Sequence, residues 1–484
     1  MRDLKAILKY IDIDAPSQLV KDLRLDSRDV TPGDVFVAIK GHALDGGQFI
    51  AKAIENGATA IIADRLCEFD VTFEPLYLVT ELDKKLPELA SQFYQNPSQS
   101  LDLIGVTGTN GKSTTTAMMA HLAQFCSTPS AIIGTLGYGH PDTLTPLINT
   151  TPSAVDLQHI LHDLKQQHKK LVAMEVSSHG LVQQRVAQCQ FKAAVFTNLS
   201  RDHLDYHGDM TSYGDAKLML FRDFDPQLVV LNQDDGQAEQ WLEKYSFNNL
   251  ICYGRKNLAP KNAQYVYFSD VEYSKNGISA QLSTSWGDIS VTSPLFGEFN
   301  LYNLTAALAT LLGLGYPLEQ LAAGCAHLHP VAGRMQAFSE VNLPTCVVDY
   351  AHTPDALETV IKAVRPHCKG RIVCVFGAGG DRDTGKRPLM GQVAHDFADI
   401  AIITDDNPRS EDPATIRAAI KEQCEGAVEI GDRAEAIKRG IGILQRNDVL
   451  IIAGKGHERG QIVGDTVLPF DDASVARSIL VGGN

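Results

Sequence analysis

Short apolar runs alternate with amphipathic stretches along most of this chain. In the first hundred residues, apolar runs at 35–39 and 59–63 flank a helical pattern at 49–54, which stops at Gly57. The same alternation resumes after residue 97. The strands that it predicts there lie at 103–106, 171–176, 193–197 and 228–231. Strands separated by helices predict a parallel sheet that is covered on both faces.

Residues 264–292 interrupt this alternation. Two strand-like runs, at 265–268 and 278–282, flank the dipeptide Asn276-Gly277, which favours a tight hairpin turn. A helical pattern at 301–314 follows, and then a stretch at 324–333 with glycine and proline that is typical of a linker. Beyond it the alternation returns. Its strands are expected at 346–349, 372–376, 400–404 and 449–453.

These patterns predict an α/β protein of three domains. Residues 1–97 would form a small N-terminal α/β domain. Residues 98–332 would form a central parallel-sheet domain with a phosphate-binding loop and an antiparallel flap, and residues 333–484 a C-terminal Rossmann-like α/β domain. A length of 484 residues agrees with about three domains.

Composition narrows the class of protein. Hydrophobic residues make up 44% and charged residues 21%, as in a soluble globular protein. The net charge of -15 argues against non-specific binding to nucleic acid or to an anionic membrane. The nine cysteines are scattered without a Cys-x-x-Cys pair, no apolar run is long enough to span a membrane, and the N-terminus does not resemble a signal peptide. We therefore expect a reduced, cytoplasmic protein.

The strand at 103–106 leads into a glycine-rich turn and then into Lys112-Ser113 at the start of a helix. Backbone N–H groups of such a turn, together with the helix dipole, hold phosphate oxygens. Lys112 would reach the outer phosphates of ATP, and Ser113 would bind Mg²⁺. The loop departs from the usual pattern, because Val106 stands where a glycine is expected. A plain glycine-rich turn is the alternative, but Lys-Ser at a helix start disfavours it.

Polar residues follow the next strands of the central segment. Glu175 ends one strand, and His203 lies in an acidic, histidine-rich turn after the next. Ligands of parallel sheets bind beyond the carboxyl ends of strands, so both side chains could bind Mg²⁺ together with Ser113. Alternatively, Glu175 caps a helix and His203 is a structural histidine.

Hydroxyl-rich turns at 150–153 and 175–180, with Arg185 close behind, admit two interpretations. They could hold an anionic second substrate, or they could be ordinary helix N-caps. The third segment presents a similar choice. Its strand ends carry Arg382, Arg409 and several carboxylates, which suit a zwitterionic amino acid but could also form a surface ion-pair network.

Taken in order, the motifs resemble those of the Mur ligases of peptidoglycan synthesis. The matching motifs are Gly-Thr-Asn-Gly-Lys-Ser-Thr, Glu-Val-Ser-Ser-His, Thr-Asn-Leu-x-x-Asp-His-Leu-Asp-Tyr-His-Gly, Asp-Tyr-Ala-His-Thr-Pro and Gly-Lys-Gly-His-Glu. In that family, Asp-Asn-Pro-Arg marks the members that add diaminopimelate, and residues 406–409 carry it intact.

The resemblance implies a role for each matching position. ATP would contact Gly108, Thr109, Asn110, Gly111, Lys112, Ser113, Thr114, Asn303, Arg334 and Asp349. The UDP-N-acetylmuramoyl dipeptide would contact Leu25, Ser27, His42, Thr150, Thr151, Ser177, Gln183 and Arg185. Diaminopimelate would contact Arg382, Asp406, Asn407, Pro408, Arg409, Gly454 and Glu458. Mg²⁺ would be held by Ser113, Glu175, His203 and a carbamylated Lys217, and the catalytic residues would be Lys112, Lys217 and His203.

The implied reaction is an ATP-dependent amide ligation. A glutamyl carboxylate of the nucleotide-sugar peptide would be phosphorylated, and the amine of meso-diaminopimelate would then attack the acyl phosphate. The three domains would bind the UDP-sugar, ATP and the amino acid in that order, and the protein is expected to be a monomer. Two alternatives stay open: a sister ligase such as a folylpolyglutamate synthase, and an ATP-hydrolysing switch that ligates nothing.

Overall fold

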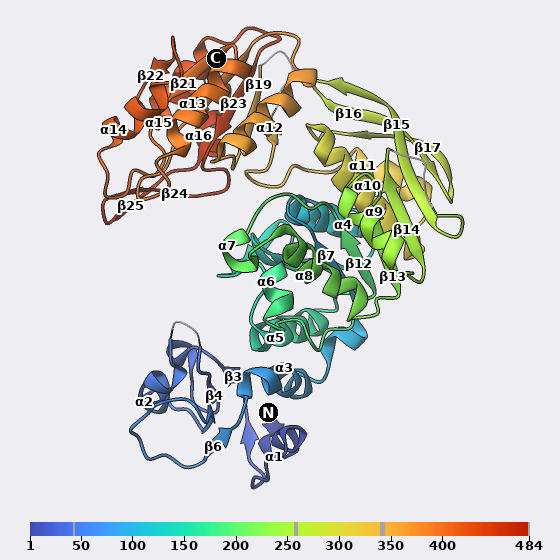
Figure 1. Ribbon diagram of the computed structural model, residues 1–484, viewed down its shortest axis with the longest axis vertical. Coiled ribbons are helices and arrows are strands. Elements are labelled where there is room, and N and C mark those ends of the chain that lie inside the picture. Colours follow the sequence, from blue (N-terminus) through green and yellow to red (C-terminus); the bar gives the residue numbers. More distant parts are fainter. Residues whose placement is uncertain (42–43, 256–259, 339–343, 483–484) are drawn as a thin grey trace. The chain divides into compact units, whose positions relative to one another are not determined.

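The computed structural model describes residues 1–41, 44–255, 260–338 and 344–482. It divides into two compact units (Figure 1). The first unit contains Met1–Cys252 and Ala309–Gly315, and the second contains Tyr265–Leu308 and Tyr316–Asn484. In the described residues, no helix is both long enough and apolar enough to cross a membrane.

The first unit begins with a small four-stranded sheet. Its strands are all parallel, in the order β3 (Leu23–Arg24), β4 (Val35–Ala38), β5 (Ala60–Asp64), β6 (Leu76–Val79). Alternate residues of β4 and β5 enter two apolar clusters, one on each face. The helices of this part are α1 (Leu4–Leu8), α2 (Ile50–Glu55) and α3 (Leu82–Phe93), and a short pair of strands, β1 (Arg2–Asp3) and β2 (Leu19–Val20), precedes the sheet.

The larger sheet of this unit carries the phosphate-binding loop. Its strand order is β10, β9, β8, β11, β7, β12, β13, β14, and β8, β11, β7, β12 and β13 are parallel to one another. The strands are β7 (Asp102–Thr107), β8 (Ser130–Gly134), β9 (Gly137–His140), β10 (Thr143–Thr145), β11 (Leu171–Glu175), β12 (Ala193–Phe196), β13 (Leu228–Asn232) and β14 (Leu250–Gly254). The helices are α4 (Lys112–Phe125), α5 (Ala154–Gln166), α6 (Ser178–Val182), α7 (Leu204–His207), α8 (Met210–Arg222) and α9 (Gly236–Lys244).

The second unit opens with the expected antiparallel flap. It consists of β15 (Gln264–Ser274), β16 (Gly277–Thr284) and β17 (Gly287–Ser293). Gly277 has φ +124°, and a Cβ there would lie 2.0 Å from the Ser293 carbonyl oxygen, so the hairpin requires glycine. Two helices follow the flap, α10 (Glu298–Gly313) and α11 (Leu318–Cys325).

The remaining part of the second unit is a parallel sheet between two layers of helices. Its strands run in the order β18 (Gln336–Phe338), β19 (Thr345–Asp349), β23 (Val449–Ala453), β20 (Ile372–Phe376), β21 (Ile400–Ile403), β22 (Val428–Glu429), of which only β18 pairs antiparallel. The other elements are α12 (Pro354–Val364), α13 (Lys386–Phe397), α14 (Pro413–Lys421), α15 (Arg433–Gly442), α16 (Asp472–Gly482) and the hairpin β24 (Gly460–Val463)–β25 (Thr466–Pro469).

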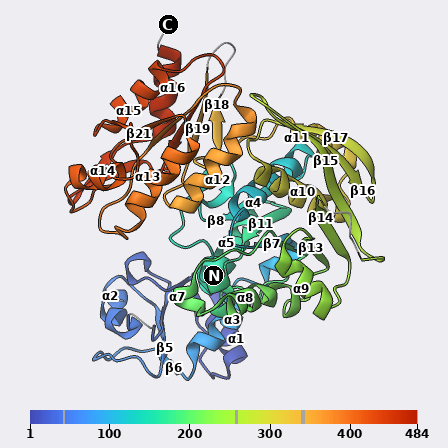
Figure 2. The same ribbon diagram turned by 45° about the horizontal axis from the view of Figure 1, so that its top comes forward.

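Two apolar cores fill the faces of this sheet. Leu357, Met390 and Ile416 come from α12, α13 and α14 and pack on one face. Ala436 and Ala476 come from α15 and α16 and pack on the other face. Figure 2 shows these two helix layers with the strands between them. The predicted α/β class, with parallel sheets and an antiparallel flap, is therefore confirmed.

Candidate active site

The loop between β7 and α4 is built as a phosphate cradle. Gly108 has φ +149°, and a Cβ there would lie 1.9 Å from Thr197 Oγ1, so only glycine fits. Lys112 begins α4, and its Nζ donates to the carbonyl oxygens of Gly108 and Thr109, both at 2.8 Å. Asn198, after β12, holds the loop from the other side, since its carbonyl accepts from Thr109 N and its Oδ1 accepts from Asn110 N. The loop is thus fixed in a curled conformation at the carboxyl edge of the sheet.

Lys217 lies beneath this loop. Its side chain comes from α8 and is only 1% exposed, and Nζ donates to the Gly108 carbonyl oxygen at 2.9 Å. The ammonium position also lies 4.4 Å from the centre of the Tyr213 ring. Burial, together with the nearby charge of Lys112, lowers the pKa of Lys217 to about 6. At neutral pH this amine is therefore mostly uncharged.

Glu175 is at the carboxyl end of β11, paired in register with Val106 of β7. Its carboxylate is buried and accepts from Thr135, at 2.9 Å from the backbone N and 3.3 Å from Oγ1. A Cβ at Gly134 would lie 2.2 Å from Glu175 Oε1, so a larger residue at this strand end would displace the Glu175 side chain. Sequence reasoning missed Thr135, although it directly follows the strand Ser130–Gly134 and the strand-end rule applies to it.

The hydroxyl-rich turns meet near Glu175. Thr151 Oγ1 is hydrogen-bonded to the Glu175 carbonyl oxygen and to Ser177 Oγ, and Arg185 Nη1 donates to the Thr151 carbonyl oxygen. Gln183 Oε1 accepts from Arg185 Nη2. Thr150 joins the group through Thr135, with their Oγ1 atoms 3.0 Å apart. Five of the residues predicted to hold the peptide are thus in one network.

The other residues predicted for that substrate are in the N-terminal part. Leu25 is half-buried and Ser27 is buried, with the Ser27 carbonyl oxygen accepting from Asn56 Nδ2. His42 lies outside the described residues.

A cluster of rings surrounds His203. The rings of His179 and His203 are 4.9 Å apart, and His207 packs against both Tyr206 and Tyr213. Burial lowers the pKa of His179 and of His207. In the described part of the chain, no three His, Cys, Asp or Glu side chains group closely enough to suggest a metal centre of their own. Glu175 and His203 therefore do not form a ready-made site without other ligands.

The remaining residues predicted to contact ATP belong to the second unit. Asp349 ends β19, is buried, and accepts from the backbone N of Met335 and of Ala351, each at 2.8 Å. Burial raises its pKa, against the opposing effect of Arg334. Arg334 lies 5.0 Å from the centre of the Tyr350 ring. Asp349, Arg334 and Tyr350 therefore lie together beside the end of β19.

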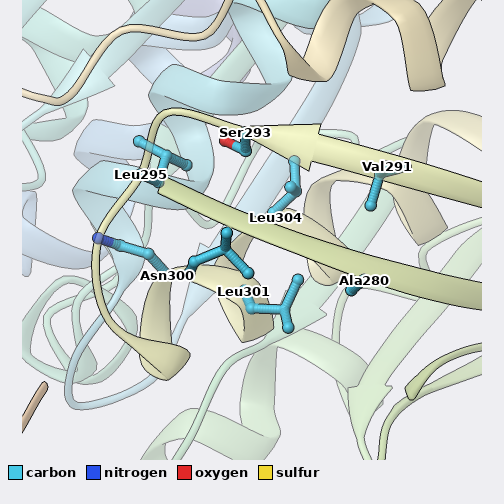
Figure 3. Close-up of a pocket in the computed structure, with 8 residues that line it drawn as sticks. Ala280, Val291, Ser293, Leu295, Asn300, Leu301 and Leu304 are labelled. Atoms are coloured by element: carbon cyan, nitrogen blue, oxygen red, sulfur yellow. The ribbon is translucent and has the colours of Figure 1, made fainter. Parts of the chain in front are cut away.

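Asn303 lies on α10 and donates from Nδ2 to Asn300 Oδ1 at 3.2 Å. Asn300 lines a small gap between α10 and the flap, together with Ser293 and Leu304 (Figure 3). The gap measures about 10 Å³, about the room of one water molecule, so it is a packing defect and no ligand site.

The strand ends of the C-terminal sheet bring the predicted amino-acid contacts together. Asn407 Nδ2 donates to Glu458 Oε2 at 2.8 Å, and Arg409 Nη1 donates to the Gly380 carbonyl oxygen at 2.7 Å. Pro408, which lies between Asn407 and Arg409 in the sequence, is buried. Arg382 is exposed. Asp406 is 7% exposed, and its Oδ2 has no hydrogen-bond partner among the described residues. A Cβ at Gly454 would lie 2.5 Å from that same oxygen, so any larger residue there would collide with it.

A buried carboxylate oxygen without a partner is costly unless a ligand supplies a donor. The α/β fold, with a glycine-rich loop between a strand and a helix that begins with a lysine, is typical of an enzyme that binds nucleotide phosphates.

Comparison with known proteins specifies the class. Three family models match the chain: the Mur ligase family catalytic domain at residues 20–94, the Mur ligase middle domain at 106–311, and the Mur ligase glutamate ligase domain at 333–456. A solved UDP-N-acetylmuramoyl-L-alanyl-D-glutamate–2,6-diaminopimelate ligase is 35% identical, with 100% of this chain and 99% of that chain covered and a TM-score of 0.72. The chain belongs to the Mur ligase family, and it is an ATP-dependent ligase.

More distant structures share the fold alone. MurF from Acinetobacter baumannii is 21% identical, with 92% of this chain and 94% of that chain covered and a TM-score of 0.67. A folylpolyglutamate synthase from Mycobacterium tuberculosis, complexed with ADP and AMPPCP, is 16% identical, with coverage of 75% and 91% and a TM-score of 0.58.

Proposed function

We propose that this enzyme joins meso-2,6-diaminopimelate to the D-glutamyl γ-carboxylate of UDP-N-acetylmuramoyl-L-alanyl-D-glutamate, in peptidoglycan precursor synthesis. The observation that carries the proposal is the C-terminal rim, where a buried Asp406 oxygen with no hydrogen-bond partner in the described part of the chain lies in the same Asp-Asn-Pro-Arg turn as Arg409. An acid suits the ammonium groups of diaminopimelate and a guanidinium suits its carboxylates. The 35% identical relative is named for this reaction.

Phosphoryl transfer would depend on the loop of the first unit. The γ-carboxylate attacks the γ-phosphorus of ATP, ADP leaves, and an acyl phosphate forms. Lys112 offsets the charge that develops on the transferred phosphoryl group. The γ-carboxylate must be anionic to attack. The hydrogen-bonded network around Arg185 and Thr151 would hold the peptide next to the loop.

Amide formation would follow at the acyl carbonyl. A neutral amine of diaminopimelate attacks it, the C–O bond to phosphate breaks, and the amine loses its proton. Arg409 and Arg382 would select the donor by its distal carboxylate. Lysine lacks that group and would leave both guanidiniums unpaired.

The donor set also fits Mg²⁺, which in this reaction neutralises phosphate charge. Glu175 and the Ser113 hydroxyl would supply hard oxygen ligands, and His203 would add a nitrogen. Lys217 would join them after carbamylation, in which its neutral amine adds to the carbon of CO₂ and releases a proton. A pKa of about 6 keeps the amine neutral at cytoplasmic pH, as that addition requires.

The domain roles follow from these assignments. Residues 1–97 would bind the UDP end through Leu25, Ser27 and His42, residues 98–332 would bind ATP and Mg²⁺, and residues 333–484 would bind diaminopimelate. We further propose that the enzyme acts as a cytoplasmic monomer, which light scattering after size-exclusion chromatography would test.

A ligation assay tests the proposed function directly. Enzyme, Mg·ATP and the nucleotide-sugar dipeptide are incubated with meso-diaminopimelate, lysine or glutamate, and phosphate release is followed together with product mass. We expect the tripeptide product only with diaminopimelate. Phosphate release without a new amide bond would contradict the proposal, and equal use of lysine or glutamate would indicate a sister ligase.

A further inference from the structure

Lys455 is a fully buried lysine that the proposed reaction leaves unused. It lies two residues beyond the end of β23, and its side chain is 0% exposed. Glycines flank it on both sides: Gly454 has φ +120° and Gly456 has φ +54°. A Cβ at Gly456 would lie 2.7 Å from Tyr350 Cβ, so the turn passes close to the β19 strand end. This tight Gly-Lys-Gly turn carries the lysine into the interior.

The ammonium group of Lys455 contacts two of the residues assigned to diaminopimelate. Its Nζ donates to Asn407 Oδ1 at 3.0 Å and to Glu458 Oε2 at 3.1 Å. A buried cation is tolerated only where it is paired and hydrogen-bonded, and these two contacts meet that condition.

The same contacts fix the orientation of both partners. Asn407 Oδ1 also accepts from Ile462 N at 3.0 Å, so the amide oxygen faces two donors and Nδ2 must point to Glu458. Glu458 Oε2 accepts from both Asn407 and Lys455. In the described residues, both hydrogen bonds to this carboxylate thus end on Oε2. That leaves Oε1 for an ammonium group of the substrate.

We infer that Lys455 is a positioning residue for the amino-acid substrate: it holds Asn407 and Glu458 in the orientation that receives the diaminopimelate ammonium group. This inference rests on the proposed function. Lys455 does not touch substrate itself, and its effect passes through the two side chains that it orients. Its loss should therefore weaken diaminopimelate binding much more than it slows phosphoryl transfer or weakens ATP binding.

The test is the Lys455→Met variant, which keeps most of the length of the side chain and removes the charge and its donors. The KM for diaminopimelate should rise about 10- to 100-fold, the range expected when a charge-assisted hydrogen bond is lost. The KM for ATP should stay within about twofold of the wild-type value, as expected where no hydrogen bond to that substrate changes. An unchanged KM for diaminopimelate in folded Lys455→Met would overturn the inference.

A double-mutant cycle separates positioning from general damage. If Lys455 acts through Glu458, Lys455→Met should add little to the KM increase already caused by Glu458→Gln. If the KM increases of the two single variants multiplied in the double variant, the two residues would act independently, and the inference would be overturned. Should Lys455→Met not fold, Lys455→Gln serves instead, because it removes the charge but leaves a polar group in the site. A wild-type KM in that variant would also overturn it.

Arg371→Met is the matched control. Arg371 pairs with buried Asp448 at 2.7 Å, where β20 and β23 begin, at the opposite ends of the strands from Lys455. Its loss should lower the melting temperature without changing the KM for diaminopimelate. The wild-type assay distinguishes the two proposals. No ligation of diaminopimelate by the wild type overturns the proposed function and this inference with it, whereas normal ligation with an unaltered KM in Lys455→Met overturns this inference alone.

Discussion

Lys217 and Lys455 are both buried lysines close to a strand end, yet their surroundings are opposite. Lys217 faces the Gly108 carbonyl oxygen and the like charge of Lys112, and its pKa falls to about 6. Lys455 faces the carboxylate of Glu458 and the amide oxygen of Asn407. Burial alone therefore does not define the role of a lysine. Lys217, hydrogen-bonded to a backbone carbonyl oxygen, becomes a neutral amine available for chemistry, whereas Lys455 forms an ion pair with a carboxylate.

The first prediction removes the charge beside Lys217. Lys112→Ala should reduce ATP turnover about 1,000-fold, because the Lys112 ammonium no longer offsets the charge on the transferred phosphoryl group. Binding of the nucleotide-sugar peptide should persist, which calorimetry would show. The pKa of Lys217 should also rise, since one of the two causes of its depression is gone. Retained ATP turnover would contradict the role of Lys112.

The second prediction concerns the rim around Lys455. Arg409→Ala should raise the KM for diaminopimelate about 10- to 100-fold without a comparable loss of any activity with lysine, so discrimination between the two amino acids relaxes. Steady-state kinetics with both amino acids measure this.

Arg365→Ala is the control for that experiment, because Arg365 pairs with Asp399 at 2.7 Å and has no assigned substrate contact. Unchanged kinetics with both amino acids in Arg409→Ala would show that Arg409 merely belongs to a surface network.

How far the sequence could predict these sites depends on the kind of signal. The apolar alternation predicted the parallel sheets, because burial on both faces leaves a direct trace in sequence. It also predicted that Glu175 and the phosphate loop share one sheet edge, since parallel strand ends do so by geometry. Thr135 was missed, although it lies at such an edge. The contacts of Lys455 could not be predicted, because its partner Asn407 is 48 residues away and only the folded turn brings them together.

Replacing Lys217 and replacing Lys455 should change the free energy of unfolding in opposite directions, because the surroundings of the two lysines are opposite. Between pH 6 and 10.5 the unfolded chain holds a proton on Lys217 that the folded chain lacks, so stability rises with pH. The slope from this group approaches about 1.4 kcal/mol per pH unit. Lys217→Met should remove that slope and stabilise the fold at pH 7, whereas Lys455→Met should destabilise it by about 1–3 kcal/mol.

Urea unfolding at several pH values in CO₂-free buffer measures both variants. Equal pH slopes in the wild type and Lys217→Met would show that the amine is not desolvated as the structure indicates. Added bicarbonate should stabilise only proteins that retain Lys217, if the residue is carbamylated.

The last prediction concerns the glycine before Lys455. Gly454→Ala should cost about 1–3 kcal/mol of stability, because φ is +120° and the new Cβ would lie 2.5 Å from Asp406 Oδ2. Gly426→Ala is the matched control: φ is +79°, with nothing within 4 Å of the added carbon, so it carries backbone strain alone. Urea unfolding should therefore show the larger loss for Gly454→Ala, and only that variant should raise the KM for diaminopimelate, because its methyl group occupies the space beside the unpartnered Asp406 oxygen. If both variants lost the same stability and had the same KM for diaminopimelate, Gly454 would be needed only for its backbone conformation, as Gly426 is in its exposed turn.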